Sequence, residues 1–291
     1  MKTNMMKKLL FLSVAMLMGT VNLVAQGIVV NKTDGTQVYF PAEQVSSIIT
    51  YGYGEGPQPS EGDTQIFMAN GVEFKMVKVE GGTFQMGSND SDADSDEKPV
   101  HEVRLSTYSI GQTEVTQELW EAVMGTNPSS IKGLKRPVEN VSWNDCQSFL
   151  TKLNQLTGQQ FRLPTEAEWE FAARGGNNSQ GYKYAGSNTI DDVAWYTYNS
   201  SSSTHDVATK QPNELGVYDM SGNVWEWCQD WYSSSYYSSS IINNPTGPTS
   251  GSYRVRRGGG WSLMAGSCRV ANRDGNAPSG SLNSLGLRLA L

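Results

Sequence analysis

The chain has 291 residues and a formal net charge of −7 at neutral pH. This length is enough for one domain with a full hydrophobic core and a small additional unit. Nucleic acids and anionic membrane surfaces repel an acidic chain, so the charge excludes both as general partners. The 30 glycines, 8 tryptophans and 13 tyrosines favour a loop-rich domain whose loops are packed by aromatic side chains.

The N-terminal residues 1–25 have the three parts of a secretory signal peptide. Three lysines precede an apolar run over residues 9–18, and Ala25 supplies a small residue for cleavage. The apolar run is too short to span a bilayer, so we predict export to the periplasm, cell surface or medium without a transmembrane segment. Loss of the three lysines would lower the net charge from −7 to −10.

A small β appendage is predicted over residues 26–51. Two short strands flank a turn at Asp34-Gly35, and a third strand is predicted over residues 45–51. Residues 52–63 are rich in glycine, proline and polar side chains, which is typical of a linker. We therefore expect the main domain to cover residues 64–291.

The main domain begins with a predicted strand over residues 72–79, which is followed by an acidic run over residues 89–97. The run contains five carboxylates but lacks the central glycine and the terminal glutamate of a calcium-binding EF-hand loop. We expect a solvated loop here.

Three helices are predicted next, each from a capping residue at its start. A Ser or Thr side chain at this position accepts a hydrogen bond from a free backbone N–H, and glycine often marks the end of a helix. The predicted helices are residues 117–124 after Thr116, residues 143–156 after Ser142, and a helix from the capping box Thr165–Glu168 to Arg174. We expect all three to be structural, with their polar side chains at caps and on exposed faces.

The sequence contains two histidines and three cysteines. The spacing of His101 and His205 does not match a zinc site or a nucleophilic triad. In an oxidising compartment, three cysteines predict one disulfide and one free thiol. Which two of Cys146, Cys228 and Cys268 would pair is left open.

Residues 216–228, GVYDMSGNVWEWC, form the most distinctive stretch of the chain. Indole rings favour burial, whereas the carboxylates of Asp219 and Glu226 need water, a partner or a cation. Two arrangements satisfy both requirements. The carboxylates and turn carbonyls could bind a hard cation such as calcium, or the stretch could be a capped turn inside a core.

Together with residues 162–176 (RLPTEAEWEFAARGG) and 257–259 (RGG), this stretch resembles the formylglycine-generating enzyme, or sulfatase-modifying factor, family. The resemblance runs over residues 72–291 in the family's order. It implies an α+β, loop-rich, C-type-lectin-like fold. It also implies one structural calcium ion, held by two side chains and two backbone carbonyls. The implied ligands are Asp219, Gly222, Val224 and Glu226.

The family's catalytic chemistry does not transfer well to this chain. Family enzymes oxidise a cysteine of a Cys-x-Pro-x-Arg sequence in sulfatases, using oxygen and a Cu(I) ion held by two thiolates. In this sequence the second of these cysteines falls on Cys268, the first falls on Leu263, and an active-site serine falls on Gly260. Neither Leu263 nor Gly260 can ligate copper or donate a side-chain hydrogen bond. We therefore expect no copper, and Cys268 would be catalytic only if the chain were an oxidase.

Two irregular segments, residues 262–267 and 274–284, lie between motifs that resemble a fixed framework. Loops on a rigid scaffold are common sites of recognition. The layout is similar to that of the variable proteins of diversity-generating retroelements, which use the same lectin-like fold and vary a C-terminal surface. A decayed active site is the alternative interpretation of the same segments.

These observations predict an exported, non-catalytic ligand-binding protein, whose ligand is a protein or another surface ligand. Arg257 and Trp261 are expected to brace the surface. The predicted contact residues are Leu263, Met264, Gly266, Ser267, Asp274, Asn276, Leu282 and Asn283. A formylglycine-generating oxidase and a fixed envelope scaffold are the rival functions.

Overall fold

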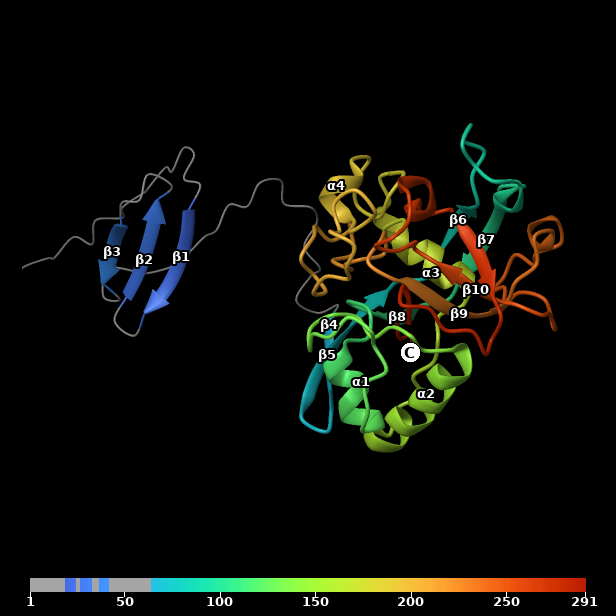
Figure 1. Ribbon diagram of the computed structural model, residues 1–291. Helices are drawn as coiled ribbons and strands as arrows, with labels where there is room; N and C mark the ends of the chain where they lie inside the picture. Colours follow the sequence, from blue (N-terminus) through green and yellow to red (C-terminus); the bar gives the residue numbers. More distant parts are fainter. Residues whose placement is uncertain (1–18, 25–26, 33–36, 42–63) are drawn as a thin grey trace, which may run out of the picture. The chain divides into compact units, whose positions relative to one another are not determined.

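The computed structural model describes residues 19–24, 27–32, 37–41 and 64–291 (Figure 1). They belong to two compact units, Met1–Gly54 and Glu55–Leu291. Among the described residues, no helix combines the length and the apolar character needed to cross a membrane.

The described part of the first unit is an antiparallel sheet of three strands. Its strands, in spatial order, are β1 (Gly19–Val24), β2 (Gly27–Lys32) and β3 (Gln37–Pro41). β2 and β3 confirm the two strands predicted on either side of the Asp34-Gly35 turn. The turn itself, the predicted strand 45–51 and the linker 52–63 lie outside the described residues. β1 lies within the predicted signal peptide, so cleavage after Ala25 would remove it.

Short strands and helices, joined by long loops, build the larger unit. The strands are β4 (Thr64–Ala69), β5 (Val72–Val79), β6 (Gly82–Met86), β7 (His101–Leu105), β8 (Tyr108–Gly111), β9 (Trp225–Trp231), β10 (Arg254–Arg257), β11 (Arg273–Asn276) and β12 (Leu285–Leu287). The α-helices are α1 (Gln117–Met124), α2 (Trp143–Thr157), α3 (Glu166–Ala173) and α4 (Ile190–Val193). Short 3-10 turns include Ser95–Glu97 and Ala265–Cys268. The loop-rich α+β class is thus confirmed.

The strands of the larger unit form three sheets, with the orders β11-β10-β9-β12, β4-β5-β8 and β6-β7. Every pairing in them is antiparallel except that of β12 with β9. α1 packs against α2, while α3 packs against β9 and β10 (Figure 1). The helix that carries the family-like motif therefore lies against the sheet that carries the C-terminal segments.

The last residues of the chain join separate parts of this unit. After β12, the backbone N–H of Gly111 donates to the carbonyl of Leu289 over 2.8 Å, and Arg162 and Ala290 exchange backbone hydrogen bonds of 2.9 and 2.8 Å. Residues 285–291 thus complete the largest sheet and attach it to β8 and to the segment before α3.

The three predicted helices are confirmed, and their caps explain where they begin. The Thr116 side chain accepts from the N–H of Leu119 at the start of α1. Ser142 and Thr165 open α2 and α3, each with a reciprocal capping box. Gly158 ends α2 with a φ of 69°, a left-handed conformation that glycine adopts at little cost.

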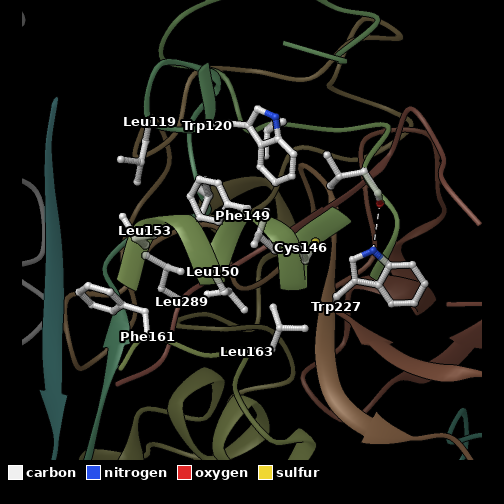
Figure 2. Close-up of a cluster of buried hydrophobic side chains, with 14 of the residues drawn as sticks. Leu119, Trp120, Cys146, Phe149, Leu150, Leu153, Phe161, Leu163, Trp227 and Leu289 are labelled. Atoms are coloured by element: carbon white, nitrogen blue, oxygen red, sulfur yellow. Dashed lines mark hydrogen bonds between the residues drawn. The ribbon is translucent and has the colours of Figure 1, made fainter. Parts of the chain in front are cut away.

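Large aromatic side chains organise the core. In the cluster drawn in Figure 2, the rings of Trp120 and Phe149 stack with centroids 4.8 Å apart. The indole N–H of Trp227 donates to the carbonyl oxygen of Val141 over 3.0 Å. A second cluster surrounds Trp169 of α3. Burying one such side chain contributes roughly 1.5–3 kcal/mol, so these rings hold the long loops in place.

The expectation of one disulfide and one free thiol is wrong. Cys146, Cys228 and Cys268 are all free and fully buried. Each belongs to a different hydrophobic cluster. Counting cysteines could not show this separation, which leaves each thiol as a small buried hydrophobic group.

Candidate ligand-binding surface

Buried ion pairs support the C-terminal segments. Arg257 is fully buried and pairs with Glu170 of α3, and its Nη1 atom donates to the carbonyl oxygens of Ala271, over 2.7 Å, and of Asn272. Burial alone would raise the pKa of Glu170, but the charges of Arg174 and Arg257 lower it below its usual value. Because a desolvated guanidinium needs its donors paired, Arg257 ties α3 firmly to the turn before β11.

Two more arginines of these segments are paired in the same way. Arg273 forms two hydrogen bonds of 2.7 Å to Glu166 of α3. Arg269 forms two hydrogen bonds of 2.7 Å to Glu97. We call Arg257, Arg269, Arg273 and their carboxylate partners the ion-pair frame.

The ion-pair frame corrects two sequence-based expectations. Glu166 and Glu170 are buried, so the polar side chains of α3 are not confined to caps and exposed faces. Asp96 and Glu97 are buried as well, so the acidic run 89–97 is not a fully solvated loop. In both cases the cause is an arginine supplied by a distant part of the chain.

A cavity of about 420 Å³ adjoins this frame, since Arg273 is part of its lining. Ser267 and Asp274, both predicted ligand contacts, line the cavity. Its other lining residues include Asp94, Asp96, Trp225 and Tyr232, which the sequence did not single out as contacts. Asp94 and Asp96 belong to the acidic run and Trp225 to the tryptophan motif, but nothing in the sequence showed that these two stretches line one cavity.

Four of the other predicted contacts lie on neighbouring loops. The side chains of Met264 and Leu282 are exposed, and Leu263 is half-buried against the first core cluster. The indole N–H of Trp261 donates to the carbonyl of Asn283 over 2.9 Å, which joins these two loops. Trp261 therefore connects two loops of the surface, while Arg257 connects the segment before β11 to α3.

A loop that the sequence did not single out joins the same surface. The N–H of Thr197 donates to the carbonyl of Leu263 over 3.0 Å, and the Ser200 hydroxyl donates to the carbonyl of Trp261 over 2.8 Å. Between them, Tyr198 is 72% exposed. A large exposed ring on a loop that is hydrogen-bonded to Trp261 and Leu263 is a further candidate contact.

The last two predicted contacts differ from each other. Gly266 faces open space, because a Cβ atom built there would meet nothing within 4 Å. The side chain of Asn276 accepts from the N–H of Ala277 over 2.9 Å, so it is used within its own turn. Position 266 would thus accept any side chain, whereas position 276 has a local structural role.

Three carboxylates gather at the Gly-Asn turn, where calcium is implied by the resemblance. Asp219 accepts from the N–H of Ala208 over 2.7 Å, and burial raises its pKa to about 6. Glu114 accepts from the N–H of Val224, over 3.0 Å, and from the side-chain amide of Asn223, over 2.8 Å. Burial and the neighbouring carboxylates raise the pKa of Glu114 well above its usual value.

Glu226, the third of these carboxylates, does not fit calcium as it is placed. It accepts three hydrogen bonds of 2.6 to 3.1 Å from Arg288 and one of 2.7 Å from Trp169. Since a carboxylate offers about four lone-pair positions, none is left for a metal ion. This geometry favours the capped-turn alternative over the calcium ion that the resemblance implies at Asp219, Gly222, Val224 and Glu226. Within the described residues, no group of three or more His, Cys, Asp or Glu side chains is arranged to hold a metal ion.

The residues at the family's copper positions are also ill suited to that ion. Cys268 is fully buried, and burial raises the pKa of its thiol to about 12, which disfavours a thiolate. Leu263 packs against a different cluster from the one that contains Cys268. A side chain at Gly260 would press on the carbonyls of Asn223 and Ser284, 3.3 and 3.4 Å from its Cβ.

The fold and the family-like motifs define a sulfatase-modifying-factor-like domain. Residues 67–291 match the sulfatase-modifying factor enzyme 1-like domain, and the chain belongs to this family. The chain is 37% identical over 240 residues to the chaperone protein LppX of Paenibacillus barcinonensis, which covers 65% of this chain and 79% of that protein. It is 31% identical over 285 residues to the formylglycine-generating enzyme of Streptomyces coelicolor, covering 74% and 88% of the two chains.

A solved structure extends the comparison to variable proteins. Treponema denticola variable protein 1 superposes with a TM-score of 0.72 at 39% sequence identity, covering 78% of this chain and 98% of that one. The resemblance to a variable protein is therefore confirmed for the fold and for a large share of the sequence.

Proposed function

We propose that this protein is an exported, non-catalytic ligand-binding protein whose C-terminal surface contacts a protein or another surface ligand. The proposal rests on the difference in exposure between the arginines of the ion-pair frame and the predicted contact residues. Arg257, Arg269 and Arg273 are at most 4% exposed, whereas Met264 is 56% exposed and Gly266 faces open space. A surface built this way changes its contacts without losing its support.

The loss of one copper-binding cysteine and of the active-site serine supports a non-catalytic role. Leu263 and Gly260 offer neither a thiolate nor a hydroxyl, and the remaining Cys268 thiol is buried. Copper-dependent conversion of a Cys-x-Pro-x-Arg peptide by the purified chain would overturn this part of the proposal and restore the oxidase.

A display library tests the binding surface directly. Positions 263, 264, 266, 282 and 283 are randomised together, and binders are selected against a folded test protein such as lysozyme. The matched control randomises five exposed positions of α2, namely Ser148, Thr151, Lys152, Gln155 and Leu156. We expect binders from the surface library only, with melting temperatures close to that of the parent chain. Equal yields from the two libraries would contradict the proposal.

We also propose that this surface is diversified in nature. The name of the Treponema denticola relative supports this step. Amplicon sequencing of codons 250–291 in one population should place substitutions at 262–267 and 274–284, with Arg257 and Trp261 unchanged. The geometry favours Leu282 over Asn276 as a varied position. A uniform stretch would remove diversification and leave a fixed binder. A natural complex that survives replacement of residues 262–267 would instead favour a fixed scaffold.

A further inference from the structure

The cavity beside the ion-pair frame has a charge that its own lining does not balance. Asp94, Asp96 and Asp274 contribute three carboxylates, and Arg273 is its one lining cation. Arg273 is already neutralised by Glu166, and its remaining Nη1 atom donates to the carbonyls of Asp96 and Ser233 over 3.1 and 3.0 Å. The cavity is therefore acidic toward an entering group.

The carboxylates of this cavity also keep free acceptor positions. Asp94 and Asp96 form hydrogen bonds through Oδ2 alone, which accepts from Asn272 over 3.1 Å and from the Tyr232 hydroxyl over 2.8 Å, respectively. The Oδ2 atom of Asp94 also lies 3.7 Å from Nη2 of Arg269, whose charge Glu97 already balances. Within the described part of the chain, the Oδ1 atom of neither residue accepts a hydrogen bond. Asp274 pairs with Arg256 over 2.6 Å, but its side chain is 46% exposed. The lining thus favours a ligand group that carries several N–H donors and a positive charge.

Trp225 supplies an independent sign of a ligand. It lines the cavity, is only 4% exposed, and its indole N–H takes part in no hydrogen bond with a described residue. Among the other buried indoles, those of Trp169 and Trp227 donate over 2.7 and 3.0 Å, whereas that of Trp120 forms no hydrogen bond with a described residue. The indole nitrogen keeps solvent-accessible surface, so it is available to an oxygen atom of a ligand.

We propose that this cavity accepts the basic side chain of a lysine or arginine from a protein ligand. The carboxylates of Asp94, Asp96 and Asp274 surround the ammonium or guanidinium group, and the Trp225 N–H donates to a main-chain carbonyl of the same ligand. This inference rests on the proposed binding function and names the chemistry of its partner. The exposed Met264, whose carbonyl accepts from the N–H of the cavity residue Ser267 over 3.0 Å, favours a polypeptide over a free amine.

The test follows the indole signals of the full chain by ¹H-¹⁵N NMR. The probes are the N-acetyl N-methylamides of arginine and lysine, with the norleucine compound as the neutral control of similar length. Trp225→Phe assigns the Trp225 signal. We expect the two basic amides to shift this signal while the norleucine amide leaves it in place. The double variant Asp94→Asn/Asp274→Asn should weaken binding about fivefold, because each charge is partly exposed.

Asp92→Asn is the matched charge control, since Asp92 pairs with Lys183 over 2.6 Å and does not line the cavity. It should leave the affinity unchanged. The other seven indole signals report whether each variant is folded. An equal shift with the norleucine amide, no shift of the Trp225 signal, or an unaltered affinity in the double variant would overturn the inference. If the display library yields binders while the basic amides fail, the inference falls and the proposed function stands.

Discussion

Replacing Arg257 with methionine tests whether the ion-pair frame stabilises the fold. Methionine retains much of the side-chain volume but removes the guanidinium from Glu170 and the donor from the carbonyls of Ala271 and Asn272. Removing one partner of a buried ion pair costs about 3–5 kcal/mol. In a domain of this size each kcal/mol lowers the melting temperature by about 2–4 °C, so the expected decrease is about 6–20 °C.

The free energy of unfolding is measured by urea titration, followed by tryptophan fluorescence and circular dichroism. Arg256→Met is the matched control, because the neighbouring Arg256 pairs with the half-exposed Asp274. Its loss should be about 1 kcal/mol or less. Equal losses in the two variants, or a loss below about 1 kcal/mol for Arg257→Met, would refute the reasoning that places stability in the buried pair.

Three further predictions concern protons, metal and thiols. Burial and the neighbouring Glu166 raise the pKa of Asp230 from 3.8 to about 8. Since the folded chain holds this proton to higher pH than the unfolded chain, its stabilising contribution is present below about pH 4 and is lost as the pH rises to about 8. Asp230→Asn, which keeps the acceptor for the N–H of Glu166, should flatten the pH dependence of unfolding, and an unchanged slope would contradict the assignment. Millimolar calcium or a chelator should leave the melting temperature unchanged, because Glu226 is fully hydrogen-bonded; a clear rise with calcium would restore the implied site. A thiol reagent should react with three cysteines in urea and none in the folded chain, whereas fewer than three in urea would indicate a disulfide.

Local sequence signals predicted much of the fold. Thr116, Ser142 and Thr165 each placed a helix start, because a capping side chain acts on backbone N–H groups only three residues away. Strand β5 was likewise predicted at residues 72–79, the positions that the structure gives. Interactions between residues this close in the chain can be predicted from the local sequence.

The candidate site depended on longer-range information. Glu166 and Glu170 could be recognised as buried only by knowing that Arg273 and Arg257 pack against α3. The cavity joins the acidic run, the tryptophan motif and the C-terminal segment, three stretches that no local pattern connects. The sequence predicted contacts on two C-terminal segments, but their division between the cavity and the loops around Trp261 required the structure.

Closure of the largest sheet depends on residues 285–291, which include the parallel strand β12. It is the edge strand beside β9, and Arg288, just after it, is the buried counter-charge of Glu226. A product truncated by a stop codon or a frameshift within residues 274–284 would lack both, and would leave buried carboxylates without their cation. Substitutions within residues 274–284 would leave β12 and Arg288 in place. A stop codon or frameshift there would leave the largest sheet without its edge strand.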